Sequence, residues 1–193
     1  MHKFTTDELV AQKPSEKEFN KLKRNPIVFI LHNIRSLENV GLFFRLADAI
    51  RAEKIYLTGY TGYPRMANDP REERIVAHAE KEIAKTAIKV VPFVPWEHVE
   101  NINSLTNLLT HSPTSYQLVA AEQTDQSVDY TLAAYRFPLA LLFGHERTGV
   151  EDELLTKCDL VVHIPMLGLG NSHNVAMSGA ILAYHLLTQS GKL

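Results

Sequence analysis

The chain has 193 residues, 45% of them hydrophobic and 22% charged, and it carries a formal net charge of −2 at pH 7. This composition is close to that of an ordinary globular protein and the length suits one domain, so a largely disordered chain is excluded. The single cysteine, Cys158, excludes an intrachain disulfide and a cluster of thiolate metal ligands. The charge argues weakly against a nucleic-acid partner, because proteins that neutralise phosphates usually carry an excess of basic residues.

Residues 1–25 are polar and charged, and we expect them to form an arm or a short helix outside the main sheet. The first residues lack the apolar stretch of a secretory signal, and no apolar run reaches the roughly 20 residues that span a bilayer. These features predict a soluble, cytoplasmic protein that does not enter a membrane. The arm carries a local basic cluster, which a solvated surface would explain equally well: Lys13, Lys17, Lys21, Lys23 and Arg24.

The rest of the chain, residues 26–193, alternates between strand-like and helix-like segments. Pro26–Leu31 is a continuous apolar run, which is typical of a strand buried on both faces of a parallel sheet. Ser36 can cap a helix over Leu37–Ile50, whose apolar residues repeat at helical spacing. The further expected strands are Lys54–Thr58, Ala87–Val94, Tyr116–Ala121, Pro138–Phe143 and Leu160–Ile164, and the further expected helices are Glu72–Lys85, Val99–Leu109 and Val175–Leu187. This alternation predicts a single α/β domain over residues 26–193, with a mostly parallel sheet and helices on both faces.

Ligands of such sheets bind beyond the carboxyl ends of the strands. Three loops in that position are rich in polar residues or glycine, and they follow Leu31, Phe143 and Ile164. In the first loop, Asn39 stands near a helix N-terminus, where backbone N–H groups favour an anion such as a phosphate. Arg45, on the same helix, can grip a phosphate with two hydrogen bonds. Alternatively, Asn39 only holds the turn and Arg45 only pairs with Asp48.

The second loop places Glu146 between Gly144 and Gly149. Glycines permit tight turns and a close approach of the backbone to a ligand. The acidic run at residues 151–153 fits the first turn of a short helix, where negative charge is favourable. Glu146 is not explained in that way, so it is the candidate functional carboxylate of this loop.

In the third loop, Gly168 and Gly170 stand between apolar residues, and Ser172 and Asn174 precede a helix. The glycine pair alone is weak evidence for a nucleotide, because it lacks the lysine of a phosphate-binding P-loop and comes late in the chain. An apolar glycine loop can instead enclose an adenine or a thioether. Ser172 alternatively serves only as the N-cap of the final helix. No pair among the nine histidines has metal-ligand spacing, so no metal site is predicted.

The final expected helix is apolar nearly all round. One face carries Val175, Gly179, Leu182 and Leu186, and another carries Met177, Ile181 and Tyr184. A helix of this kind is expected to be buried on two sides. Gly179 lowers helix stability by about 1 kcal/mol relative to alanine, so close packing against another backbone is the expected reason for it.

The order of the three loops resembles the SpoU, or TrmH-like, branch of the SPOUT RNA methyltransferases, over residues 26–187. Family motif one resembles Asn39-Val-Gly-Leu-Phe-Phe-Arg45, motif two resembles Gly144-His-Glu146-Arg-Thr-Gly149, and motif three resembles Ile164-Pro-Met-Leu-Gly168 followed by Ser172-His-Asn174. Each motif alone is moderately specific, whereas the three in this order are a strong match. The sequence departs from the family at His173, where leucine is common, and at the bulky His145 and Arg147.

The resemblance implies a C-terminal trefoil knot whose loops bind S-adenosylmethionine, in a homodimer that completes the site. It implies methyl transfer to a ribose 2′-hydroxyl of a structured RNA, tRNA in preference to rRNA. The catalytic residues that it implies are Asn39, Arg45, Glu146, Ser172 and Asn174. The cofactor-binding residues that it implies are Phe143, Gly144, Glu146, Ile164, Met166, Gly168, Leu169, Ser172 and Asn174. The RNA-binding candidates are Arg35, Arg45, Arg147, Lys21, Lys23 and Arg24.

Two other functions stay open at this point. A non-catalytic RNA-binding or assembly factor with the same fold would not need all five catalytic residues. An α/β enzyme that acts on a small nucleotide without RNA is slightly favoured by the low overall basicity. Arg45 is the base that the family resemblance suggests, but a free guanidinium keeps its proton at any ordinary pH. We therefore expect Arg45 to hold a substrate phosphate, while a phosphate oxygen or water accepts the proton.

Overall fold

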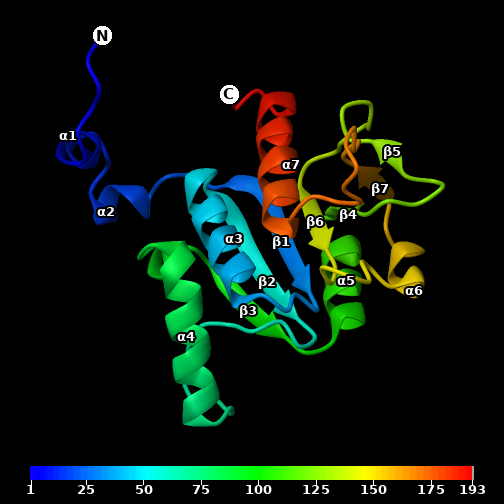
Figure 1. The fold of residues 1–193 in the computed structure, drawn as a ribbon, viewed down its shortest axis with the longest axis horizontal. Helices are drawn as coiled ribbons and strands as arrows, with labels where there is room; N and C mark the ends of the chain where they lie inside the picture. The colour runs from blue at the N-terminus through cyan, green and yellow to red at the C-terminus, as the bar shows by residue number, and fades with distance from the viewer. Residues whose placement is uncertain (193) are drawn as a thin grey trace.

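The computed structural model describes residues 1–192, which contain a seven-stranded sheet in the order β3-β2-β1-β6-β4-β7-β5 (Figure 1). The strands are β1 (Asn25–His32), β2 (Ala52–Thr58), β3 (Trp96–Val99), β4 (Gln117–Ala121), β5 (Val128–Asp129), β6 (Leu139–Phe143) and β7 (Leu160–His163). Every neighbouring pair is parallel, which confirms the predicted α/β class and extends it from a mostly parallel to an all-parallel sheet. The carboxyl ends of all seven strands therefore lie along one edge.

Helices cover both faces of the sheet, as predicted. The helices are α1 (Thr6–Ala11), α2 (Glu16–Phe19), α3 (Leu37–Ala49), α4 (Glu73–Ala87), α5 (Ile102–His111), α6 (Asp152–Leu155) and α7 (Val175–Gln189), with a 3₁₀ turn η1 at Val91–Phe93. One apolar cluster joins α3, α4 and α7 to the sheet, and the other joins α5 and α6 to its opposite face. Within residues 1–192, no helix combines the length and the apolar character that a membrane crossing requires.

The central strand β1 contributes side chains to both apolar clusters. Ile27, Phe29 and Leu31 face the first cluster, while Val28 and Ile30 face the second. All five side chains are at most 2% exposed, which confirms the prediction of a strand buried on both faces. Successive side chains of a strand point to opposite faces, so a strand between two helical layers must be apolar throughout.

The predicted strand at Ala87–Val94 is wrong. Helix α4 continues to Ala87, Ile88 follows in the left-handed region with φ of 48°, and a 3₁₀ turn begins at Val91. Pro92 lies in this turn and lacks the N–H that a central strand donates to its neighbour. The strand is formed instead by Trp96–Val99, so the helix predicted from Val99 begins only at Ile102.

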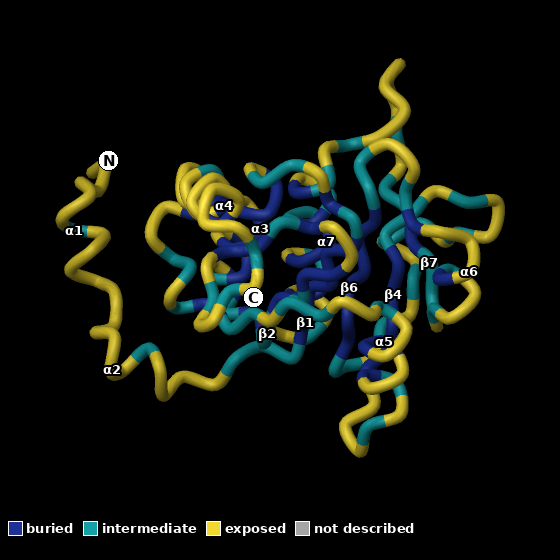
Figure 2. Tube along the Cα trace, turned by 90° about the horizontal axis from the view of Figure 1, so that it is seen from below, coloured by how far each residue is buried: buried dark blue, intermediate teal, exposed yellow. Residues whose placement is uncertain are grey.

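Helices α1 and α2 lie outside the sheet, whereas Asn25, which was expected in the arm, is the first residue of β1. Neither α1 nor α2 has a buried residue, and Figure 2 shows the arm extending away from the core. The arm contacts the core through the ring of Phe19, whose centroid lies 6.4 Å from that of Phe93. Arg24 donates hydrogen bonds to the carbonyls of Ala52 and Phe93 (3.3 and 2.8 Å), so its side chain fixes the start of β1.

Close packing between α7 and α3 explains Gly179. A Cβ at this position would lie 2.5 Å from Cε1 of Phe43, which is shorter than real Cβ contacts. The face of α7 that includes Leu182 and Leu186 is buried, as predicted. The second face is not covered by the described residues, because Met177 is 57% exposed and Tyr184 is 46% exposed.

Replacing Gly179 with alanine is expected to lower the free energy of unfolding by about 1–3 kcal/mol, because the new methyl group overpacks the contact with Phe43. Alanine favours a helix by about 1 kcal/mol over glycine, so helix propensity alone predicts the opposite sign. Gly168→Ala is the control, since no atom lies within 4 Å of its added Cβ. Urea unfolding of both variants tests the contact, and a stabilised Gly179→Ala protein would contradict it.

Candidate active site

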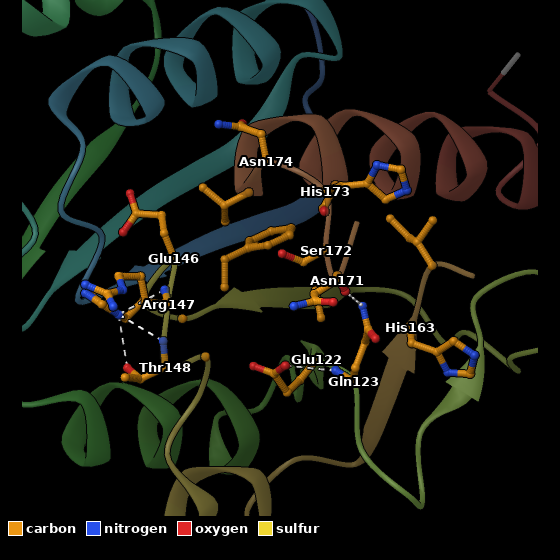
Figure 3. Close-up of a pocket in the computed structure, with 18 of the residues that line it drawn as sticks. Glu122, Gln123, Glu146, Arg147, Thr148, His163, Asn171, Ser172, His173 and Asn174 are labelled. Carbon is orange, nitrogen blue, oxygen red and sulfur yellow. Dashed lines mark hydrogen bonds between the residues drawn. The ribbon is translucent and has the colours of Figure 1, made fainter. Parts of the chain in front are cut away.

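A cavity of about 560 Å³ opens beyond the carboxyl ends of β4, β6 and β7 (Figure 3). Its walls include six of the predicted cofactor-binding residues: Phe143, Gly144, Glu146, Ile164, Ser172 and Asn174. They also include polar residues that the sequence analysis did not single out, among them Glu122, Gln123 and His163. Met166, Gly168 and Leu169 are not among the residues that line it. Leu169 is fully exposed, so the tip of the third loop stands clear of the cavity.

Glu146 joins the first two predicted loops. Its carboxylate accepts hydrogen bonds from the backbone N–H groups of Arg35 (2.9 Å) and Ser36 (3.0 Å) and from Nδ2 of Asn39 (3.0 Å). The Ser36 hydroxyl accepts from the backbone N–H of Asn39 at 3.2 Å, which confirms Ser36 as the N-cap of α3. The carboxylate thus takes up N–H groups at the start of α3.

Asn39 and Asn174 continue the connection to the third loop. Asn39 is buried, and its Oδ1 accepts from Nδ2 of Asn174 at 3.0 Å. Oδ1 of Asn174 accepts from the backbone N–H groups of Ala176 and Met177, so Asn174 is the N-cap of α7. The alternative that assigned this cap to Ser172 is therefore wrong, and the Ser172 side chain is left facing the cavity.

The Glu146 carboxylate is held in its charged form. Partial burial acts to raise the pKa of Glu146, but hydrogen bonds from Arg35, Ser36 and Asn39 outweigh it and lower the pKa. At neutral pH Glu146 is therefore an acceptor and a fixed negative charge. A carboxylate with a lowered pKa is a weak general base. The hydrogen bonds of Glu146 instead tie its own loop to the loop that starts α3.

The Glu122 side chain supports the loop that contains Gly144 and Gly149. It follows β4, and its Oε2 accepts from the backbone N–H of Val150 at 2.8 Å. Gly149 adopts φ of +71°, and a Cβ there would lie 2.0 Å from the Glu122 carboxylate. The neighbouring Gln123 donates to the carbonyl of Asn171 at 3.0 Å, which ties the third loop to the same strand end. The strand-end rule that identified three loops would also have found Glu122, if applied to the strand ending at Ala121.

The candidate RNA contacts fall into two groups. Arg35, Arg45 and Arg147 are exposed, and their guanidinium groups form no ion pair or hydrogen bond with the described residues. The alternative pairing of Arg45 with Asp48 does not occur among the described residues. Burial raises the pKa of Asp48, and the positive charges of Lys13 and Arg24 offset part of this effect. In the arm, Lys21 and Lys23 are exposed, whereas Arg24 is partly buried on backbone carbonyls.

The described part of the chain contains no group of three or more His, Cys, Asp or Glu residues that could hold a metal ion. The site instead combines an apolar floor, a charged carboxylate and amide side chains. Such a site can bind and orient a polar organic ligand by hydrogen bonds and apolar contact.

Comparison with known proteins identifies the family. Residues 26–184 match the model of the SpoU rRNA Methylase family, so the chain belongs to that family. A TrmH-family protein of Staphylococcus haemolyticus is 27% identical over 160 residues, covering 82% of this chain and 57% of its own length. The tRNA (guanosine(18)-2'-O)-methyltransferase of Escherichia coli is 30% identical over 95 residues, covering 49% of this chain and 42% of its own.

Solved structures show the same fold. The AdoMet-bound rRNA methyltransferase from Sinorhizobium meliloti superimposes with a TM-score of 0.70 at 24% identity, covering 86% of this chain and 57% of the other. The chain spans little more than half the length of the first curated relative that it matches, at 57%.

Proposed function

We propose that the protein transfers a methyl group from S-adenosylmethionine to a ribose 2′-hydroxyl of RNA, with tRNA favoured over rRNA. The observation that supports this most is a set of hydrogen bonds from Glu146 through Asn39 to Asn174, which connects the three motif loops. The second and third of these loops line the cavity. Family membership supports the reaction class, and the name of the Escherichia coli relative supports a tRNA substrate. A simple binding module has no need for this arrangement of three loops.

The cavity fits the cofactor that this reaction requires. Its volume of about 560 Å³ suits a ligand of nucleoside size. Phe143, Val162 and Leu182 offer apolar contact for an adenine or a thioether, and Glu122 and Gln123 offer polar groups nearby. Bound there, S-adenosylmethionine would supply a methyl group already activated on a sulfonium.

The protein's share of the reaction is positioning. Arg45 is exposed on α3, six residues beyond the buried Asn39, and its guanidinium has no partner among the described residues. We assign it the phosphate beside the target ribose, and Ser172 and Asn174 the orientation of the nucleotide. A phosphate oxygen or water then accepts the hydroxyl proton, since neither Arg45 nor the low-pKa Glu146 carboxylate is suited to do so.

The sheet order supports the proposed trefoil knot in the domain formed by residues 26–193. Strand β7 lies between β4 and β5, although β4 and β5 are joined by an earlier stretch of chain. The later strand is therefore inserted in the sheet between two strands that precede it in the sequence, and the chain afterwards forms α7, which packs against α3. This order is compatible with a chain that passes through an earlier loop. Such knots are rare, and here a knot would fix the cavity-lining loops against each other.

The uncovered face of α7 supports a homodimer. Met177 and Tyr184 expose about half of their surface on a helix whose other face is buried. A second copy of the chain would cover this apolar face and bring a second set of motif loops close to the first. Light scattering at micromolar concentration should show a dimer, and a fully active monomer would contradict the assignment.

We expect isothermal titration calorimetry to show one S-adenosylmethionine bound per subunit, with no change when a chelator is added. Leu182→Gln should weaken this binding, because Leu182 is 1% exposed and faces both the core and the cavity. Leu108→Gln is the matched control on the exposed side of α5, where Leu108 is 62% exposed. No heat and no thermal shift with the wild-type protein would contradict the cofactor proposal.

A further inference from the structure

An aromatic pair stands on the same sheet edge as the cavity. Tyr60 follows β2 and His145 follows β6, on either side of the loop that leaves β1. Their ring centroids are 6.2 Å apart and their planes are inclined by 73°. Tyr60 is 61% exposed, so its ring faces solvent where most aromatic side chains would be buried.

The backbone beneath Tyr60 is held rigidly. Gly59 adopts φ of +63°, and a Cβ there would lie 2.0 Å from Oδ1 of Asn33. That same oxygen accepts from the backbone N–H of Tyr60 at 3.2 Å. Next to it, the Thr61 hydroxyl accepts from the N–H of Ile34 at 3.0 Å and donates to a carbonyl of β1. The exposed ring is therefore presented by an ordered turn, which lowers the conformational entropy lost when a ligand binds it.

The ring of His145 is also fixed. Its Nδ1 accepts from the backbone N–H groups of Arg147 and Thr148, both at 3.1 Å. Because Nδ1 accepts, the proton of the neutral ring is on Nε2. The imidazole thus stands edge-on to Tyr60, next to Glu146 and the motif loops.

Two exposed arginines lie in neighbouring loops on the same edge of the sheet, and their guanidinium groups have no hydrogen bond or ion pair within residues 1–192. Arg35 lies in the loop after β1 and Arg147 in the loop after β6, and both side chains are exposed. Their backbone N–H groups are taken up by Glu146 and His145, so the loops are fixed while the guanidinium groups are available to a ligand. An aromatic face beside positive charge matches a nucleobase joined to its phosphates.

We propose that Tyr60 and His145 form a stacking platform for an unpaired nucleobase of the RNA substrate, with Arg35 and Arg147 holding the adjacent phosphates. The inference rests on the proposed function and deepens it by naming the substrate class. Bases inside an A-form duplex do not offer their faces, so the platform selects a nucleotide in a loop, a bulge or a single strand. The cavity lies beyond β4, β6 and β7 and the platform beyond β2, β1 and β6, so cofactor and base occupy neighbouring parts of one edge.

The test is fluorescence anisotropy with a labelled nine-nucleotide RNA of mixed sequence that forms no secondary structure. Tyr60→Ala should weaken binding by about 5- to 100-fold, since stacking on an aromatic ring contributes this much per base. Tyr60→Phe keeps the ring and should stay within about twofold of the wild type. Phe4→Ala, which removes another exposed ring on the arm, should leave affinity unchanged.

The salt dependence of RNA affinity distinguishes the contribution of base stacking from that of charge. Tyr60→Ala should keep the slope of log affinity against log salt, whereas Arg35→Ala should reduce its size by about 0.7, the value for one phosphate contact on a single strand. Thermal melting and cofactor calorimetry on each variant establish that the fold and the cavity are intact.

Each alternative outcome is distinct. RNA affinity unchanged in Tyr60→Ala, with cofactor binding and methyl transfer intact, overturns the platform and leaves the proposed function standing. A wild-type protein that binds the RNA but no S-adenosylmethionine overturns the proposed function. In that case the RNA affinity of the Tyr60 variants still tests the platform. A Tyr60→Ala protein that loses its dimer at unchanged RNA affinity marks the pair as a protein contact and overturns the inference.

Discussion

Replacing Arg45 with alanine is expected to slow methyl transfer by about 10²–10³-fold while leaving the affinity for S-adenosylmethionine nearly intact. Its guanidinium is exposed and unengaged by the described residues, so it is available to hold a substrate phosphate as charge shifts in the transition state. Removing one preorganised charge-stabilising group typically has an effect of this size. Arg45→Lys keeps the charge but loses the planar pair of donors, so it should recover only part of the rate.

Single-turnover transfer of labelled methyl to unfractionated tRNA measures the Arg45 effect. Arg74→Ala is the matched control, because Arg74 is also an exposed arginine on a helix, α4. If Arg45 made only surface interactions on its helix, its removal would change the free energy of unfolding by at most about 1 kcal/mol. Turnover would then stay within a few-fold of the wild type. That result would contradict a role for Arg45 in methyl transfer.

Replacing Glu146 with glutamine is expected to lower both activity and stability. Glutamine keeps the shape but has one acceptor oxygen, so the N–H groups of Arg35, Ser36 and Asn39 can no longer all be satisfied. Leaving such donors unpaired lowers the free energy of unfolding by about 1–3 kcal/mol. The loosened contact between the motif loops should slow methyl transfer by about 100-fold, since small misplacements have effects of this order.

The pH dependence identifies the charge as the cause. Because hydrogen bonds lower the pKa of Glu146 in the folded protein, its carboxylate stabilises the fold fully above the ordinary glutamate pKa of about 4.3. This stabilisation is lost as the pH falls through the lowered pKa, so the difference between wild type and Glu146→Gln should shrink in acid. Glu100→Gln, at an exposed position, should show no such difference. If the difference in unfolding free energy between wild type and Glu146→Gln stays constant down to the pH of acid unfolding, the charged contact is ruled out.

The core strands and their helices could be predicted because their apolar patterns are long and regular. The run at Pro26–Leu31 lies in β1, and the capped segment from Leu37 forms α3. Strand β5, Val128–Asp129, has only two residues and carries no period of its own. The segment at Ala87–Val94 is as β-branched as a strand, and there the proline and the left-handed residues determine the structure.

The candidate site shows a similar division. Glycine spacing and strand ends identified Glu146 and Asn39, since both stand inside recognisable motifs. Glu122 contacts Val150 across 28 positions, and that contact depends on how the strands are ordered in the sheet. Ser172 and Asn174 can both cap a helix, and they stand only two positions apart. The sequence therefore does not specify at which of them α7 begins, and the structure places the cap at Asn174.

The most direct test of the proposed activity is a methyl-transfer assay with purified protein, labelled S-adenosylmethionine and unfractionated tRNA and rRNA. The RNA is digested to nucleosides, and the labelled product is identified by chromatography and mass spectrometry. The predicted result is label in a 2′-O-methylated nucleoside, chiefly from tRNA, that forms about 10²–10³-fold more slowly with the Arg45→Ala protein. Label on a base, or no label in either RNA from a protein that binds the cofactor, would contradict ribose methylation.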